Sequence, residues 1–135
     1  RESAGLPELR ALTVGFFEHV DGVALDWPMA PVVPTLHGGE GKLILNLAAL
    51  AAEALPRGGT VSIAVDEARF AARADGDEAT LREDVAAAAD PGAAVDQLTP
   101  RTVHAYLTAI LAAEAGRSLV FERETPGSIA LVAAR

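Results

Sequence analysis

The chain has 135 residues, of which 50% are hydrophobic, and this length and composition suit one domain with a single core. It contains no cysteine, which excludes disulfides, thiolate nucleophiles and cysteine-ligated zinc sites. Its net charge of -8, with scattered basic residues, would repel phosphate backbones, and no apolar run approaches the roughly 20 residues of a membrane helix. We therefore expect one soluble domain, residues 1–135, that binds neither nucleic acid nor membrane.

The first third of the chain predicts a helix and a strand. Apolar residues recur at intervals of three and four from Pro7 to Val20, the spacing of one helix face. From Val23 to Trp27 the side chains alternate, which predicts a half-buried strand. The proline-rich segment from Pro28 to Pro34 then predicts an extended surface connection.

The middle of the chain predicts a buried helix and a hairpin. A broad apolar face from Gly41 onward indicates the central helix, which Pro56 and Gly58-Gly59 end. Residues 61–65 and 70–74 each alternate with a period of two, which favours antiparallel strands.

The last part predicts two helices and a second hairpin. Residues 78–89 favour a short helix, and Thr99 is expected as the N-cap of a longer one that ends at Gly116. Residues 118–122 and 129–133 alternate as strands. The whole order predicts an α+β fold, a two-layer sandwich of about five mostly antiparallel strands with helices on one face.

Residues 43–59, LILNLAALAAEALPRGG, resemble a kinase pattern in which L-x-N-L is followed by N-A and then by P-x-G-G. With the layout from about Val23 to the end, this resembles the ATP-binding fold of sensor histidine kinases, gyrase-type ATPases and related chaperones. Asn46 matches the first asparagine of the pattern. Leu50 stands where the resemblance places the asparagine that holds magnesium, and leucine offers no lone pair to a metal.

Two glycine-rich nucleotide loops of this fold also lack good counterparts. The adenine-reading Asp-x-Gly-x-Gly loop is matched only by Asp75-Gly76-Asp77-Glu78. The phosphate loop is matched by residues 96–99, which contain no glycine, and Asp96 would repel phosphate. The resemblance therefore implies a degenerate ATPase-like domain with no cofactor and no ATPase or autokinase activity.

Among proteins of this fold, the chain most resembles the C-terminal domain of bacterial histidine phosphotransferases of the ChpT type. Three stretches carry this resemblance, 26–28, 51–59 and 101–107. It implies a cytoplasmic two-component phosphorelay, with a hybrid histidine kinase and response-regulator receiver domains as partners. This domain would help to dock a receiver.

The same resemblance implies a homodimer formed through a helical hairpin upstream of this domain, with the phosphoacceptor histidine on that hairpin. The chain begins at Arg1 with no signal-like leader, so we expect a fragment of a cytoplasmic protein. The helix from Pro7 to Val20 is either the connection to this hairpin or the first element of the sandwich.

The three histidines are weak candidates for the acceptor, because family acceptors are typically followed by an acidic residue. His19, His37 and His104 are followed by valine, glycine and alanine. We expect them in surface or capping roles, so the chain contains no predicted catalytic residue.

Other polar residues are predicted to be structural. His37 and Glu40 lack a third metal ligand, and we predict no metal site. Glu53 has no evident titratable partner and is expected to be solvated rather than a catalytic base. Arg101 and Tyr106 either support the helix or line a docking surface. A solvated charged face is expected from Asp75, Asp77, Glu78, Arg82, Glu83 and Asp84.

Two other functions remain open from the sequence. One is a divergent ATPase or kinase domain, and the other is a protein-binding adaptor that takes no part in phosphotransfer. Binding measurements separate these hypotheses.

Overall fold

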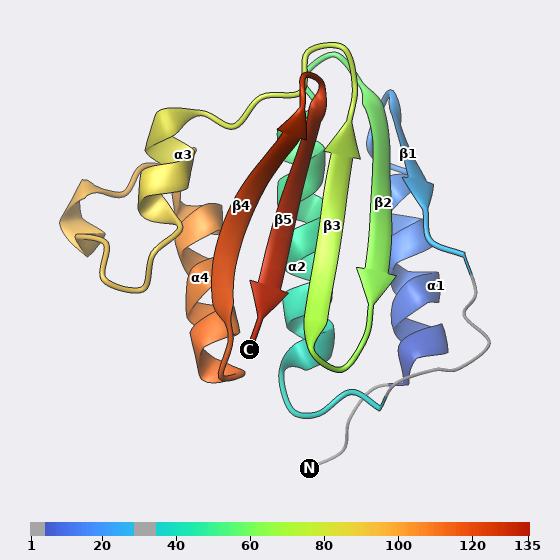
Figure 1. Cartoon of the computed structure of the whole chain (residues 1–135), viewed down its shortest axis with the longest axis horizontal. Coiled ribbons are helices and arrows are strands. Elements are labelled where there is room, and N and C mark those ends of the chain that lie inside the picture. The colour runs from blue at the N-terminus through green and yellow to red at the C-terminus, as the bar shows by residue number, and fades with distance from the viewer. Residues whose placement is uncertain (1–4, 29–34) are drawn as a thin grey trace.

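In this structure, a computed structural model that describes residues 5–28 and 35–135, five strands form one sheet in the order β1-β2-β3-β5-β4 (Figure 1). β1 pairs parallel with β2, and the other neighbours pair antiparallel. The predicted five-stranded, mostly antiparallel sheet is confirmed. Residues 29–34 of the predicted Pro-rich connection lie outside the part of the chain that the structure describes. The strands are β1 (Val23–Asp26), β2 (Gly59–Val65), β3 (Arg69–Asp75), β4 (Ser118–Thr125) and β5 (Ser128–Ala134).

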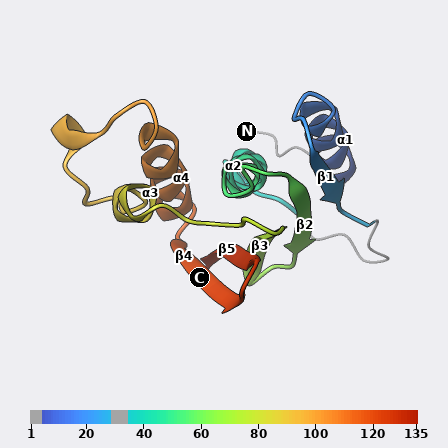
Figure 2. The same cartoon turned by 90° about the horizontal axis from the view of Figure 1, so that it is seen from above.

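Three helices cover one face of the sheet, with α2 between α1 and α4, and a short helix, α3, lies beside α4 (Figure 2). This arrangement is the predicted two-layer α+β sandwich. Every described helix is too short or too polar to cross a bilayer. The helices are α1 (Leu6–Phe17), α2 (Glu40–Glu53), α3 (Glu83–Ala88) and α4 (Val103–Glu114), with a 3-10 turn at Val95–Gln97.

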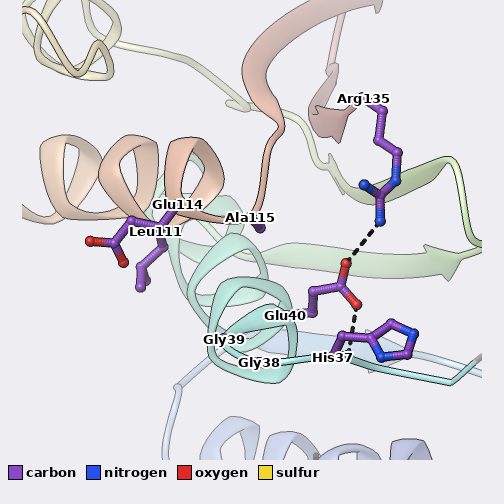
Figure 3. Close-up of a pocket in the computed structure, with 8 residues that line it drawn as sticks. All are labelled: His37, Gly38, Gly39, Glu40, Leu111, Glu114, Ala115 and Arg135. Atoms are coloured by element: carbon purple, nitrogen blue, oxygen red, sulfur yellow. Dashed lines mark hydrogen bonds and ion pairs between the residues drawn. The ribbon is translucent and has the colours of Figure 1, made fainter.

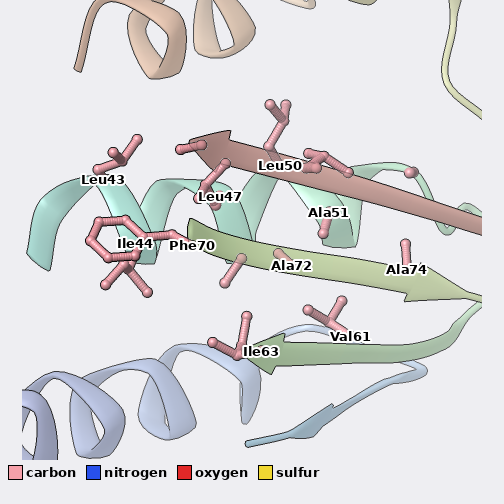
Figure 4. Close-up of a cluster of buried hydrophobic side chains, with 14 of the residues drawn as sticks. Leu43, Ile44, Leu47, Leu50, Ala51, Val61, Ile63, Phe70, Ala72 and Ala74 are labelled. Carbon is pink, nitrogen blue, oxygen red and sulfur yellow. The ribbon is translucent and has the colours of Figure 1, made fainter. Parts of the chain in front are cut away.

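The core lies between α2 and the middle strands. The apolar face of α2 meets the alternate side chains of β2, β3 and β5 that point towards the helices (Figure 4). Burial of such side chains stabilises the fold by about 1.5 to 3 kcal/mol each. The most buried include Leu43, Ile44, Leu47, Val61, Phe70, Ile129 and Leu131.

The start of α4 differs from its prediction. Thr99 was expected as the N-cap, but the backbone amides of Thr102 and Val103 donate to the Thr99 carbonyl and form a separate turn, so α4 begins at Val103. The Thr102 hydroxyl accepts from the Thr99 amide. Gly116 follows the helix with a φ of 73°, as predicted for the residue after a helix C-terminus.

α3 is shorter than the predicted helix over residues 78–89. The amide of Thr80 donates to the carbonyl of Ala54 at 2.9 Å, which ties this part of the chain to the end of α2. The helix itself begins only at Glu83.

A buried arginine joins four segments at one end of the sheet. Arg117 follows α4, and its guanidinium donates to the carbonyls of Glu67, Ala68 and Ala133 at 2.9, 3.1 and 3.2 Å. It also donates to the carboxylate of Glu40, on the first residue of α2, at 3.2 Å. The side chains of Arg117 and Glu40 are only 1% and 7% exposed.

The rest of this network satisfies most of the buried charge. The guanidinium carbon of Arg117 lies 3.7 Å above the ring of Phe70, a cation–π contact. Glu40 accepts from the backbone amide of His37 at 2.8 Å and from Arg135 at 3.4 Å. Nε of Arg117 is the one buried side-chain polar atom in the described part of the chain without a partner.

Replacing the arginine should destabilise the fold strongly. We expect Arg117→Met to lower the free energy of unfolding by about 3 to 5 kcal/mol, because it removes the buried charge that pairs with Glu40 and leaves that carboxylate only the longer contact to the exposed Arg135 as a counter-charge. Urea unfolding of the purified chain measures this change. Arg69→Met is the control, since the Arg69–Glu122 pair is 45% and 44% exposed, and its cost should stay under about 1 kcal/mol. If Arg117→Met lowered the free energy of unfolding no more than Arg69→Met does, the buried pair would contribute no more to stability than an exposed one, which would contradict the prediction.

Candidate functional site

The position that resembles a magnesium ligand lies inside the core. Leu50 is 2% exposed and belongs to the buried cluster beneath α2 (Figure 4). Its neighbours Leu47 and Ala51 are buried with it. At this position the chain contributes hydrocarbon to the sheet–helix contact and presents no oxygen.

The glycines near the adenine-loop counterpart serve backbone packing. A Cβ on Gly76 would lie 2.5 Å from the carbonyl oxygen of Gly58 and 2.9 Å from Cδ2 of Leu55. A Cβ on Gly59 would collide with the carbonyl of Asp75. The amide of Gly76 also donates to the carbonyl of Gly127 at 2.9 Å. Three loops therefore meet here through contacts that only glycine allows.

The carboxylate of Asp75 is paired on the other face of the sheet. It follows the buried Ala74 along β3, so it shares the helix-free face with Arg73, whose Nε donates to it at 2.9 Å. Burial alone would raise the pKa of Asp75, but hydrogen bonds from Arg73 and Ser128 outweigh it and hold this pKa below its ordinary value. A cavity of about 470 Å³ near this turn is lined instead by Arg57, Gly58, Gly59, Gly76, Asp77 and Glu78.

The counterpart of the phosphate loop is an exposed turn. Asp96 and Gln97 lie in the 3-10 turn and are exposed. In the charged region predicted to be solvated, Arg82 pairs with Asp84 at 3.1 Å on the surface, and its hydrogen bond lowers the pKa of Asp84. The remaining members of that region, Asp77, Glu78 and Glu83, are exposed as well.

A polar triad joins α2 to α4, and it contradicts the expectation that Glu53 lacks a titratable partner. Nδ1 of His104 lies 2.6 Å from Oε2 of Glu53. Nε2 of the same ring lies 2.9 Å from Oδ1 of Asn46. The side chain of His104 is 24% exposed and that of Glu53 is 50% exposed. His104 is thus a bridge between helices rather than a surface or capping residue.

The pair singled out as an incomplete metal site has another role. His37 and Glu40 line a cavity of about 430 Å³ at the start of α2, together with Leu111, Glu114 and Arg135 (Figure 3). The carboxylate of Glu40 is already bonded to the His37 amide and to arginine. No cluster of three or more metal-ligating side chains occurs within residues 5–28 and 35–135.

Exposed apolar side chains gather on the helices rather than on the sheet. Val103 and Leu107, one turn apart on α4, are 37% and 51% exposed, and we call them the α4 ridge. Leu12 and Phe16, one turn apart on α1, are 66% and 42% exposed. Of the candidates for a docking surface, Arg101 is exposed and Tyr106 is half-buried.

Solved structures share this fold at low sequence identity. A bacterial phosphotransferase matches with a TM-score of 0.79 and 21% identity over 97% of this chain, which spans 64% of that protein's length. The catalytic domain of the histidine kinase ThkA matches with a TM-score of 0.66 and 15% identity, over 98% of this chain and 94% of that one. The cytoplasmic segment of the histidine kinase QseC matches with a TM-score of 0.58 and 16% identity, over 98% and 76%. The fold is that of a histidine-kinase catalytic domain.

A comparison with protein families places the chain more narrowly than the fold does. The model of the histidine phosphotransferase C-terminal domain matches residues 6–127, so the chain belongs to this family. No curated protein sequence matches the chain. The predicted resemblance to the C-terminal domain of ChpT-type phosphotransferases is confirmed.

Truncation of Leu50 tests the packing at the altered magnesium position. We expect Leu50→Ala to reduce the free energy of unfolding by about 2 to 5 kcal/mol, because the side chain is buried and its removal leaves a cavity. Thermal or urea unfolding measures this change, with Leu12→Ala on the exposed side of α1 as the control. A loss below about 0.5 kcal/mol, the scale of a neutral surface change, would show that Leu50 does not fill the core.

Proposed function

We propose that this domain docks the receiver domain of a response regulator, as part of a histidine phosphotransferase that moves a phosphoryl group between receiver aspartates through a histidine. Membership of the histidine phosphotransferase family supports this role. The histidine itself is proposed to lie outside residues 1–135, on a hairpin that also forms a homodimer. The cytoplasmic location expected from the sequence belongs to the same proposal.

The α4 ridge is the observation that carries the docking role. Val103 and Leu107 expose apolar surface side by side, and contiguous apolar surface of this kind supports a contact with a partner protein. The ridge lies on the helix that carries the resemblance over residues 101–107. Glu53 and Arg101, at its edges, offer charges of both signs for a polar rim.

We propose further that the domain binds no magnesium-ATP. Three features support this: Leu50 is buried in the core, Gly76 is in contact with Gly58, and Asp75 is paired on the opposite face. Each removes a contact that the resemblance assigns to the nucleotide. The domain would therefore provide a docking surface, and the receiver domain that donates the phosphoryl group would take the place of ATP as its source.

Calorimetric titration tests the nucleotide proposal. Magnesium-ATP added to the purified chain should give no saturable heat up to millimolar concentration, because the metal and the phosphates find no anchor. An active sensor-kinase catalytic domain, titrated in parallel, is the positive control. Micromolar binding would overturn the proposal and favour the divergent ATPase.

A charged substitution on the ridge tests the docking proposal. The probes are the purified receiver domains encoded in the genome that encodes this chain. We expect at least one to bind, and Leu107→Glu to weaken that binding at least tenfold, since it places an unpaired charge in an apolar contact. Thermophoresis or calorimetry measures the dissociation constants.

Two matched controls locate the surface. Val120 on β4 is 45% exposed and lies on the sheet, so Val120→Glu should leave receiver binding unchanged. Leu12→Glu changes the other exposed pair, on α1. Loss of binding in Leu12→Glu but not in Leu107→Glu would place docking on α1 and contradict the proposal.

The sequence upstream of residue 1 in the parent protein distinguishes a phosphotransferase from an adaptor that takes no part in phosphotransfer. An upstream helix that contains a histidine followed by aspartate or glutamate would support the phosphotransferase. A parent without such a helix would favour the adaptor, even where receivers bind the α4 ridge.

A further inference from the structure

The triad of Asn46, His104 and Glu53 has a defined pattern of donors and acceptors. Nδ2 of Asn46 donates to the carbonyl of Lys42 at 2.8 Å. A carbonyl oxygen can only accept, so the amide group of Asn46 that faces it must be the NH2, and Oδ1 of Asn46 is then the atom directed at Nε2 of His104. The ring nitrogen that faces Oδ1 must therefore donate.

The second ring nitrogen must donate as well. Nδ1 of His104 faces the Glu53 carboxylate at 2.6 Å, and an ionised carboxylate only accepts. An imidazole that donates from both nitrogens is an imidazolium. Loss of either ring proton would bring a nitrogen lone pair against an oxygen lone pair, so both contacts are satisfied only while the ring is charged.

Glu53 is the ionisable group that pairs with the His104 ring, and the other charged residues nearby lie elsewhere. α2 presents Glu53 and, one turn from Asn46, Lys42, whose side chain is on the exposed side of the helix. α3 and β4 pack against α4 near Ala109 and Ala113, on the side of α4 away from His104. Arg101 and Glu114 lie at the two ends of the α4 region. Among the described residues that hydrogen-bond to the ring, the one counter-charge is therefore Glu53.

The triad sits next to the ridge proposed to dock the receiver. His104 follows Val103 directly and lies less than one turn before Leu107. Its two bonds reach positions 46 and 53, two turns apart on α2, so they fix both the rotation and the height of α4 against α2. Backbone hydrogen bonds within each helix cannot supply that restraint.

We propose that the charged ring of His104, held by Glu53 and Asn46, is a positioning residue that braces α4 against α2 and sets the geometry of the α4 ridge for its partner. The positioning role rests on the proposed docking function, whereas the brace does not. The brace is complete only where the ring carries both protons, because loss of either proton leaves one of the two oxygens on α2 without a donor.

A double-mutant cycle in the purified chain tests the brace. His104→Gln and Glu53→Gln remove the two charges, and glutamine at 53 still offers an acceptor to the ring. At pH 5.5 each variant should raise the unfolding equilibrium constant by about fivefold, and the double variant should raise it no further than either one. At pH 9 the two effects should become independent and small.

The pH profile separates the brace from ordinary packing. His37→Gln is the control, because the ring of His37 is exposed and its recorded hydrogen bond comes from the backbone amide. This control should show no coupling to Glu53→Gln at either pH. Absence of coupling at pH 5.5, or coupling of the same size at pH 9, overturns the brace.

Receiver binding tests the positioning role. We expect His104→Gln to weaken binding by about threefold to tenfold at pH 6, and wild type and variant to converge at pH 8.5. Equal affinity of the two at pH 6 overturns the positioning role. A pH-dependent coupling together with full receiver binding by Leu107→Glu overturns the docking proposal and supports the brace alone.

Discussion

The buried ion pair between Arg117 and Glu40 is the constraint on which the rest of the layout depends. Removing both charges from water costs several kcal/mol each, and only a complete set of partners offsets it. Arg117 finds those partners in the carbonyls of Glu67 and Ala68, in the turn between β2 and β3, and of Ala133 on β5, together with the Glu40 carboxylate and the Phe70 ring. Only its Nε has no partner among the described residues. Since Glu40 opens α2, this network fixes where the central helix begins over the sheet.

The opposite end of α2 is fixed by backbone rather than by charge. Gly58, Gly76 and Gly127 approach one another so closely that a side chain on the first two would meet a carbonyl within 2.6 Å. The absence of side chains at these glycines is therefore used for contact between loops of the chain itself. α2 is thus held at both ends, and the apolar cluster around Leu50 fills the length between them.

Local patterns were sufficient to predict most of the fold. The three- and four-residue spacing before Pro56 and the two-residue alternation on either side of Asp66 each encode an element within one window of sequence. The tertiary contacts of the candidate site were not predictable in this way. Glu53 and His104 are separated by 51 residues, so neither shows its partner locally. Arg117 reads as an ordinary charge after a helix, since its burial depends on strands that arrive from elsewhere.

Leu50 and the contacts at Gly76 stabilise the domain without a ligand. A domain that binds nucleotide gains stability as RT ln(1 + [L]/Kd), so its geometry responds to ligand concentration. Apolar filling at Leu50 and the glycine contacts at Gly76 belong to the chain and act at every ATP concentration. The docking surface that we propose on α4 is then presented whether or not nucleotide is abundant. In the proposed brace, the placement of that surface depends instead on two oxygens of α2, on Glu53 and Asn46, that accept from the two ring nitrogens of His104.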